Sequence, residues 1–329
     1  MKILVTGATG YMGTELIRDL LERNHEVIGL YRDKNRIRIP HHPKLTWKKC
    51  NLFDPEEMKS CLAGCEIVFH LAAYARVWTR NMNDYYNINV IGTRNLLAAA
   101  VEVGVRKLIY TSTAGVLGPS NGNMVDETNM PFQDYFTEYE RTKSIAEKLL
   151  LDFKKKEMQT IILLPSRIFG PGLLSESNGV TRLIQKYIQG RWRILPGNGK
   201  KVGNYAYIRD VVRGHIQALA YNGHNERFIL GGTNTDYREL FNTIGVATGK
   251  KRWLIPVPAK IILFLSHLLL FYARIMGHPP LITPDWAKKY MHDWRISSQN
   301  AIDHLGYQIT PMDKAIRETV EWLNTQNYE

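Results

Sequence analysis

Short apolar runs alternate with longer amphipathic stretches along the first half of the chain. Residues 2–6 ("KILVT") form a β-branched run, and residues 14–24 ("TELIRDLLERN") place apolar side chains at helical spacing. The succession continues in the segments "EVIGLY", "LTWKKC", "EIVFHLAA", "NVIGTRNLLAAAVEVG", "KLIYTS", a helix from about Tyr139, and "TIILLP". Strands that alternate with helices at this spacing predict right-handed βαβ units, and therefore a parallel sheet covered by helices on both faces.

The regular alternation ends near residue 167, after which the pattern loosens. We therefore predict an α/β protein with a doubly wound parallel sheet and a smaller C-terminal lobe. Two later segments, "YAYIRDVVRGHIQALAY" and "RFILGG", predict a return of the chain to the sheet. This pattern assigns residues 1–167 and 204–232 to the sheet domain, and residues 168–203 and 233–329 to the lobe.

One strongly apolar segment, "KIILFLSHLLLFYARIMG" at residues 260–277, has several interpretations. Its apolar core is shorter than the roughly 20 residues that a bilayer span needs, and Ser266 and His267 interrupt it. The preferred interpretation is a buried helix of the lobe, and a transmembrane span is not expected. Because Lys260 and Arg274 flank the segment, weak contact with a membrane surface and the wall of an apolar substrate pocket are the alternatives.

The composition is that of a globular protein with an excess of positive charge. Of 329 residues, 44% are hydrophobic and 22% are charged, and 43 Lys and Arg against 31 Asp and Glu give a net charge of +12. Nucleic acid, an anionic membrane surface or an anionic cofactor would each suit this charge. Short basic clusters such as "GKKVG" and "GKKRW" are scattered along the chain without a nucleic-acid-binding module, so nucleic-acid binding is not expected.

Three cysteines, Cys50, Cys61 and Cys65, indicate the redox environment. Their odd number, and an N-terminus that leads directly into a predicted strand, favour reduced thiols and a cytoplasmic protein. The spacing from Cys61 to Cys65 is not that of a zinc site, and no His partner lies nearby at zinc-ligand spacing. We therefore expect no metal site.

A glycine-rich turn follows the first predicted strand and begins the first predicted helix. In "KILVTGATGYMG" the three glycines are Gly7, Gly10 and Gly13, with Tyr11 and Met12 between the last two. Glycines at these positions let the backbone turn tightly and approach a pyrophosphate, whose charge then lies at the helix N-terminus. Because the turn joins a strand to a helix, it predicts a Rossmann dinucleotide-binding site that includes all five residues.

The end of the second predicted strand distinguishes NADP from NAD. An acidic residue there accepts hydrogen bonds from a ribose 2′-hydroxyl, whereas an arginine pairs with a 2′-phosphate. The sequence "VIGLYRDKNR" places Arg32 at the strand end, with Arg36 close behind, and Asp33 one residue beyond Arg32. NADP(H) is therefore favoured over NAD(H), with Arg32 and Arg36 as candidate phosphate ligands.

The segment "YERTK" places Tyr139 and Lys143 four residues apart at the start of a predicted helix. On an α-helix, positions i and i+4 share one face, so Lys143 can act on a group that bonds to the Tyr139 hydroxyl. A free tyrosine has a pKa of about 10 and is a poor acid/base at neutral pH unless cations stabilise its phenolate. Alone, this spacing more often means an exposed helix face than a catalytic pair.

Taken together, the chain resembles the extended short-chain dehydrogenase/reductases. The resemblance extends over most of the chain and rests on the motifs "TGATGYMG", "NLFD", "HLAA", "NVIGTRNLL", "YTSTAGVLG", "YERTK" and "PSRIFGPG", in this order. The resemblance implies a Rossmann domain with a C-terminal substrate lobe, Tyr139 as the catalytic acid/base, and Lys143 as the cation beside it. It also makes a homodimer plausible.

The resemblance assigns further residues to the site. Thr113 matches the family's Ser or Thr that orients the substrate oxygen, with Ser112 as the fallback. Asn89 in "NINV" matches an active-site asparagine, although a buried capping amide would explain it equally well. Near the dinucleotide, the expected residues are Asn51 and Leu52 at the adenine, Leu71, Ala72 and Ala73 on the pocket floor, and Pro165 and Ile168 beside the nicotinamide.

The branch of the family determines the expected substrate. Nucleotide-sugar epimerases of the family carry an arginine that binds the substrate pyrophosphate, where this chain has Gly203, and only Lys288 and Lys289 stand near the place of a second arginine. "LLPSRIFGPG" and "NYAYIRDVVRGH" are more similar to dihydroflavonol-4-reductase and 3β-hydroxysteroid dehydrogenase-like members. We therefore expect an NADP(H)-dependent oxidoreductase that interconverts a fairly apolar ketone or aldehyde and an alcohol. The alternatives are a nucleotide-sugar epimerase or dehydratase with a retained NAD(P), and a non-catalytic dinucleotide-sensing regulator.

Overall fold

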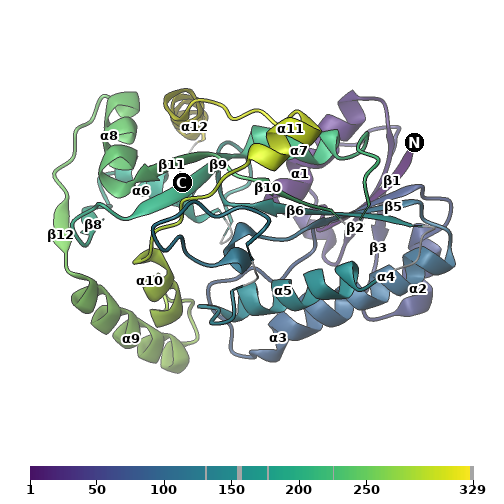
Figure 1. Cartoon of the computed structure of the whole chain (residues 1–329), viewed down its shortest axis with the longest axis horizontal. Helices are drawn as coiled ribbons and strands as arrows, with labels where there is room; N and C mark the ends of the chain where they lie inside the picture. The colour runs from purple at the N-terminus through teal and green to yellow at the C-terminus, as the bar shows by residue number, and fades with distance from the viewer. Residues whose placement is uncertain (130–131, 154–157, 176–177, 225, 327–329) are drawn as a thin grey trace.

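The computed structural model describes residues 1–129, 132–153, 158–175, 178–224 and 226–326. A seven-stranded sheet with strand order β10-β6-β5-β4-β1-β2-β3 forms its centre, and all neighbouring strands are parallel (Figure 1). The strands are β1 (Lys2–Thr6), β2 (Glu26–Tyr31), β3 (Leu45–Lys49), β4 (Ile67–His70), β5 (Lys107–Thr111), β6 (Gln159–Pro165) and β10 (Glu226–Leu230). The predicted doubly wound parallel sheet is confirmed.

Helices cover both faces of this sheet. Figure 1 shows α2 (Pro55–Leu62), α3 (Asn83–Tyr86), α4 (Gly92–Glu102) and α5 (Glu138–Leu151) on one side, and α1 (Tyr11–Glu22), α7 (Ile208–Gln217) and α11 (Gln299–Leu305) on the other. Along β1, Ile3 and Val5 pack into the core on one face while Leu4 packs into the core on the opposite face. Burial on both faces explains why the strands have continuous apolar sequences.

The remaining strands form two small sheets. A three-stranded sheet has the order β11 (Thr233–Asp236), β9 (Val202–Tyr207) and β7 (Arg167–Phe169), and β8 (Ile194–Pro196) pairs with β12 (Ile255–Val257). The other helices are α6 (Gly179–Ile188), α8 (Tyr237–Thr248), α9 (Ala259–Met276), α10 (Pro284–Tyr290) and α12 (Met312–Thr325).

The return of the chain to the main sheet is only partly as predicted. The segment "RFILGG" contributes β10, which pairs with β6 in parallel register. In the segment "YAYIRDVVRGHIQALAY", Tyr205–Tyr207 instead complete β9, which pairs with β7 and β11, while Ile208–Gln217 form α7 on one face of the main sheet. β10 occupies the place beside β6 at this end of the main sheet, and β9 lies in the separate three-stranded sheet. The division at residues 167, 204 and 232 stays a prediction.

The prediction of a buried helix at residues 260–277 is wrong. Within α9 only Ser266 and Ala273 are buried, whereas Phe264, Phe271 and Ile275 are exposed. Figure 1 shows α9 at the outer edge of the molecule, with α10 on its inner side. In the described part of the chain, α9 is the one helix long and apolar enough, by length and composition, to cross a membrane. Hydropathy alone could not reveal that so little of the protein covers this helix.

Candidate active site

The glycine-rich turn packs too closely for any other residue at two of its positions. A Cβ atom on Gly7, whose φ is 67°, would lie 2.7 Å from the backbone nitrogen of Ala72, and a Cβ atom on Gly13 would lie 2.2 Å from the carbonyl oxygen of Gly7. Gly10 precedes α1, which has no side-chain cap and no acidic residue in its first turn. The N–H groups at this helix N-terminus therefore suit the phosphates of a dinucleotide.

Tyr11 and Met12 have structural contacts within the same turn. The buried Tyr11 donates a hydrogen bond of 3.0 Å to the carbonyl oxygen of Gly170, and its ring lies against Gly172. Met12 is half-buried and packs against the core. These contacts hold the loop after β7 against α1, and a direct contact of either residue with a dinucleotide stays a prediction.

Acidic and basic side chains at the end of β2 have different surroundings. Asp33 caps the short 3₁₀ helix Lys34–Arg36 by accepting a hydrogen bond of 3.0 Å from the backbone N–H of Asn35. Arg32 and Arg36 are exposed, and neither guanidinium is paired with another group in the described part of the chain. The carboxylate therefore has a structural partner, while both guanidinium groups are available to an anion.

Asn51 and Leu52 lie just after β3, at the same end of the sheet. The Asn51 amide oxygen accepts a hydrogen bond of 3.1 Å from the N–H of Phe53, and its backbone N–H donates to Glu57 at 3.0 Å. Leu52 packs against Gly92 at the start of α4. The Asn51 side chain is exposed and held in a defined orientation, with one lone pair of the amide oxygen still available.

A buried histidine connects the glycine-rich turn to the loop after β4. The Ala72 N–H donates to the Thr6 hydroxyl at 3.0 Å, the Thr6 hydroxyl lies 2.7 Å from His70 Nδ1, and His70 Nε2 lies 2.9 Å from the Thr93 hydroxyl. Because Thr93 donates to the carbonyl oxygen of Asn89, it accepts from His70, which assigns the ring proton to Nε2. Burial, with a smaller effect of Lys143, lowers the pKa of His70 to about 3.

Leu71, Ala72 and Ala73 form the half-buried start of that loop, and their position on the floor of a dinucleotide pocket stays a prediction. Leu71 packs against the core, and its backbone N–H donates to the carbonyl oxygen of Thr6 at 3.3 Å. The hydrogen bonds of Thr6 therefore fix this segment beside Gly7.

Asn89 continues the same hydrogen-bond network towards α5. It lies in the π-helical turn Asn87–Ile91, and its amide oxygen accepts from the N–H of Tyr74 at 2.7 Å. Its amide nitrogen donates to the Thr142 hydroxyl at 2.9 Å, and Thr142 in turn bonds to the carbonyl oxygen of Tyr139. The buried amide therefore positions α5 relative to the turn, a role that agrees with the occurrence of π-bulges at functional sites.

The start of α5 is fixed by a capping box. The Thr137 hydroxyl accepts from the N–H of Glu140 at 3.3 Å, and the Glu140 carboxylate accepts from the N–H of Thr137 at 3.2 Å. Tyr139, Lys143 and Glu147 follow at intervals of four residues and so share one face of the helix. The structure thus places the predicted pair on a helix with a well-defined beginning.

The Lys143 ammonium group is buried without an acidic ion-pair partner in the described part of the chain. Its Nζ lies 3.9 Å from the ring centre of Tyr110, a cation–π contact. Burial lowers the pKa of Lys143 to about 7, and the nearby Glu147 carboxylate partly opposes this shift. Burial, with a smaller effect of Glu140, raises the pKa of Tyr139, so its phenolate requires added positive charge.

The two hydroxyl groups after β5 point to different surroundings. Ser112 is buried and donates to the Glu147 carboxylate. Thr113 is half-buried, caps the 3₁₀ helix Ala114–Leu117, and accepts from the N–H of Gly115 at 3.2 Å. Among the described residues the Thr113 hydroxyl proton has no acceptor, so Thr113 retains a donor for a substrate oxygen whereas Ser112 does not.

Pro165 and Ile168 lie on either side of a residue that the sequence analysis missed. Pro165 is buried at the end of β6, and Ile168 is half-buried in β7. Between them, the Arg167 guanidinium carbon lies 4.8 Å from the ring centre of Tyr290, and a Cβ atom on Gly203 would lie 2.5 Å from Arg167 Nη1. Arg167 therefore fills the space above Gly203.

Three further residues of the site were not predicted: His70, Tyr110 and Glu147. Glu147 stands eight residues after Tyr139, and this helical spacing could have identified it. Its carboxylate lies 3.1 Å from Arg227 in a nearly buried ion pair. His70 is the last residue of β4, and Tyr110 is the last but one of β5. No sequence pattern distinguishes either residue from the other core residues of these buried strands.

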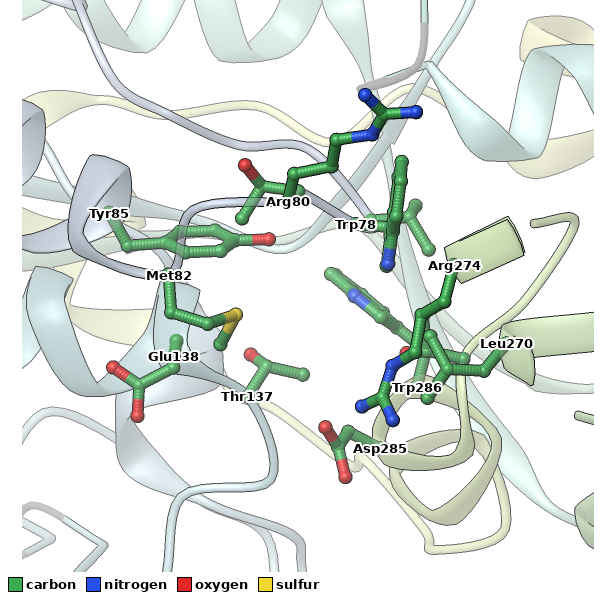
Figure 2. Close-up of a pocket in the computed structure, with 13 residues that line it drawn as sticks. Trp78, Arg80, Met82, Tyr85, Thr137, Glu138, Leu270, Arg274, Asp285 and Trp286 are labelled. Carbon is green, nitrogen blue, oxygen red and sulfur yellow. The ribbon is translucent and has the colours of Figure 1, made fainter. Parts of the chain in front are cut away.

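A cavity of about 520 Å³ lies beside the start of α5 (Figure 2). Its walls come from the loop at residues 77–82, from α3, and from α9, α10 and the segment between them. Thr137 and Glu138 line it, so it begins one residue away from Tyr139. Arg80 and Arg274 also line it, together with the carboxylates of Glu138 and Asp285 and the indoles of Trp78 and Trp286.

Comparisons with known proteins agree with this geometry. The model of the NAD dependent epimerase/dehydratase family matches residues 3–231. The chain is 32% identical over 313 residues to the 2-alkyl-3-oxoalkanoate reductase of Stenotrophomonas maltophilia, covering 87% of the chain and 91% of the relative. It is 29% identical to a 3-beta-hydroxysteroid dehydrogenase of Mycolicibacterium neoaurum, covering 70% and 63%. The fold is shared with the UDP-glucose 4-epimerase of Thermotoga maritima, with a TM-score of 0.80 at 24% identity over 98% and 99% of the two chains.

Proposed function

The chain belongs to the NAD dependent epimerase/dehydratase family, and from this premise we propose that it is an NADP(H)-dependent oxidoreductase that interconverts an apolar ketone or aldehyde and the corresponding alcohol. Membership makes it an NAD(P)-dependent enzyme of the extended short-chain dehydrogenase/reductase type, as the motifs predicted. The preference for NADP, the role of Tyr139 and the class of substrate are the proposed parts.

The observation that carries the proposal is the shared face of α5. Tyr139 and Lys143 lie one turn apart, and hydrogen bonds through Thr142, Asn89, Thr93 and His70 connect this helix to the glycine-rich turn. A sensor that only binds a dinucleotide needs no proton-transfer pair held in this way. The network therefore favours catalysis at a defined distance from the dinucleotide.

The residues of the glycine-rich turn fit a dinucleotide. Gly7, Gly10 and Gly13 leave room for phosphates at the uncapped N-terminus of α1. Arg32 and Arg36, unlike Asp33, have guanidinium groups available for a 2′-phosphate, which supports NADP. When bound, the reduced nicotinamide supplies a hydride to the substrate carbonyl carbon.

The protein's own side chains supply the proton and orient the substrate. The Thr113 hydroxyl donates to the carbonyl oxygen, and the Tyr139 hydroxyl transfers its proton to the same oxygen as that oxygen gains negative charge. The buried Lys143 then stabilises the Tyr139 phenolate, which regains its proton from solvent. In the reverse direction, the phenolate acts as the base.

An apolar substrate is supported by the surroundings of Gly203 and Lys289, which stand at or near the places where nucleotide-sugar enzymes of the family bind a pyrophosphate. Arg167 occupies the space above Gly203 and stacks on tyrosine rings. Lys289 Nζ lies 2.6 Å from the Glu140 carboxylate and 4.6 Å from the ring centre of Trp286, so its charge is already paired. Two of the relatives are named for the reduction of alkyl oxoalkanoates and the dehydrogenation of steroids, which agrees with this substrate class.

The test is a measurement of NADPH and NADH consumption with ketones of increasing apolar size, using wild-type protein and the Tyr139→Phe variant. We expect wild-type protein to consume NADPH with apolar ketones. Tyr139→Phe should lower kcat by at least about a hundredfold, because general acid catalysis contributes about 10²- to 10⁴-fold, and should leave NADPH affinity nearly unchanged.

The matched control is Tyr86→Phe, since Tyr86 is an exposed tyrosine on α3, outside the proposed site. Normal turnover by Tyr139→Phe would refute the acid/base role. Dinucleotide binding without net consumption would instead favour an epimerase or dehydratase with a retained cofactor, if a nucleotide sugar is converted, or a sensor if none is.

A further inference from the structure

Helix α9 presents apolar side chains to solvent instead of to the protein. Helix α10 packs along the inner side of α9 (Figure 1), and within α9 Ser266 and Ala273 are buried while Ile262, Leu263 and Leu270 are half-buried. Its outer side carries Ile261, Phe264, Leu265, Leu268, Leu269, Phe271, Tyr272, Ile275 and Met276, all of which are exposed. Phe271 is 65% exposed, and the outer side contains far more apolar surface than a monomeric protein normally leaves in water.

The charges around this apolar surface have a single sign. From Leu240 through Pro284 the sequence contains no aspartate or glutamate, while it contains Lys250, Lys251, Arg252, Lys260 and Arg274. Trp253, which is 80% exposed, lies among these basic residues, in the segment between α8 and β12. Figure 1 shows α8, β12 and α9 along one edge of the molecule, so the basic and apolar residues share this edge. Apolar and aromatic groups bordered by Lys and Arg are typical of segments that bind anionic lipid surfaces.

The connections of α9 determine its orientation relative to a membrane. Before the helix, β12 pairs with β8, and after it α10 packs along α9. Both ends of α9 are therefore held by the same lobe, and a helix that crossed a bilayer would have to leave one of these contacts. With 18 residues, α9 is about 27 Å long at about 1.5 Å per residue, close to the roughly 30 Å of a bilayer's hydrocarbon core, so the contacts that hold its two ends, and not its length, argue against a span.

We propose that α9 docks on an anionic lipid bilayer, with its axis in the plane of the interface and its outer side inserted among the acyl chains. The neighbouring basic residues pair with lipid phosphates. A second copy of this chain is a poorer occupant, because a two-fold interface through this surface would bring the exposed Lys250, Lys251 and Lys260 close to their own copies without a carboxylate from the same segment.

Docking through α9 would also bring the cavity beside the start of α5 close to the bilayer. Leu270 and Arg274 of α9 line the cavity beside the start of α5, together with Trp286 of α10 (Figure 2). The bilayer surface would therefore adjoin one wall of this cavity.

The test is a co-sedimentation titration of the full chain with phosphatidylcholine vesicles, prepared with and without phosphatidylglycerol. We expect the wild-type protein to bind the phosphatidylglycerol vesicles strongly and the neutral vesicles weakly. The variant L268E/F271E should bind at least about a hundredfold more weakly, because it replaces two inserted apolar side chains by charges. The control I302E/I309E changes two exposed isoleucines outside α9 in the same way and should bind like the wild type.

A second variant tests the charge contribution separately. K250Q/K251Q/K260Q should bind phosphatidylglycerol vesicles roughly a hundredfold more weakly, about fivefold for each basic residue, and neutral vesicles as the wild type does. All of the substituted side chains are exposed, so the folded state should be retained. Failure of the wild type to bind either vesicle, or equal binding by L268E/F271E, would overturn the proposal. A dimer that becomes a monomer in L268E/F271E, without vesicle binding by the wild type, would assign the surface to a second copy instead.

Discussion

At the scale of single residues, the acidic and basic side chains at the end of β2 have two different roles, capping of a short helix and availability to an anion. Asp33 caps a short helix through the N–H of Asn35, so its carboxylate serves the local backbone. Arg32 and Arg36 have no such task. The identities of these residues could be read from the sequence, but the direction of the Asp33 side chain depends on the conformation of the turn that follows the strand.

We expect Arg32→Ala to weaken NADPH binding by about ten- to a hundredfold and NADH binding by less than about threefold, because a hydrogen bond to a charged group contributes about 1.5–3 kcal/mol. Titration of nicotinamide fluorescence with each dinucleotide measures this difference. The matched control is Arg38→Ala, an exposed arginine of the same loop whose guanidinium donates to the carbonyl oxygen of Asn35. Equal losses for the two dinucleotides would show that the 2′-phosphate is bound elsewhere.

Two buried neutral histidines predict the acid sensitivity of the fold. Burial lowers the pKa of His70 to about 3 and that of His215 to about 4, whereas an unfolded histidine has a pKa of about 6.5. Below about pH 6.5 the unfolded chain binds protons that the folded chain does not, so the free energy of unfolding falls as the pH decreases towards these folded-state values. His70→Gln should therefore show a shallower fall between about pH 6.5 and 4.

Urea unfolding at a series of pH values measures this slope. His304→Gln is the control, since His304 is exposed. A slope for His70→Gln that equals that of the wild type would mean that folding does not lower the pKa of His70.

At the scale of elements, α5 and α10 are joined by a buried ion pair. Lys289 Nζ lies 2.6 Å from the carboxylate of Glu140, which is fully buried and also completes the capping box of α5. The indoles of Trp286 and Trp294 lie 4.6 and 5.1 Å from the same ammonium group. The helix that carries Tyr139 is thereby fixed to the helix that packs on α9.

Lys289→Met should lower the free energy of unfolding by about 3–5 kcal/mol, because it leaves a carboxylate buried without its cation. The double variant Lys289→Met/Glu140→Gln should regain most of this loss, since glutamine is neutral and can still complete the capping box. Urea unfolding of both variants, with the exposed Lys288→Met as control, measures the effect. If the double variant were no more stable than Lys289→Met, the lost free energy of unfolding would not come from the unpaired carboxylate of Glu140.

The elements that the sequence predicted best are those whose pattern is determined locally. The strands β1 to β6 and the helices α1, α4 and α5 follow from apolar runs, glycine-rich turns and helical spacing, and Gly7 to Gly13 mark the glycine-rich turn without reference to the rest of the chain. Strand β9 was placed in the wrong sheet because strand pairing depends on which edges are free. The hydropathy of α9 indicated an apolar helix but not its exposure. Likewise, Asn89 and Arg167 acquire their roles from partners more than thirty residues away, such as Thr142 and Tyr205.

At the scale of the whole molecule, the proposed docking surface and the proposed active site adjoin one another. α9 contributes both the outer surface that we expect to meet the bilayer and the side chains of Leu270 and Arg274 in the cavity wall. The cavity in turn begins at Glu138, next to Tyr139. If both proposals hold, a ketone dissolved in the bilayer has a short route to the site.

We therefore expect anionic vesicles to lower the apparent KM for a long-chain ketone that partitions into lipid, by at least about tenfold, and to leave the KM for a short water-soluble ketone unchanged. A ketone that partitions into lipid is concentrated in the bilayer, and docking places the proposed active site next to this local pool, so a lower total concentration of ketone suffices for half-maximal rate. L268E/F271E should lose the effect on the long-chain ketone while it retains the wild-type kcat/KM for the short one, and I302E/I309E should behave like the wild type. Activity is followed by NADPH absorbance. If vesicles lowered the KM for the long-chain ketone equally in L268E/F271E and I302E/I309E, the supply of substrate would not depend on docking through α9. Absence of turnover with either ketone would instead count against the proposed reductase activity itself.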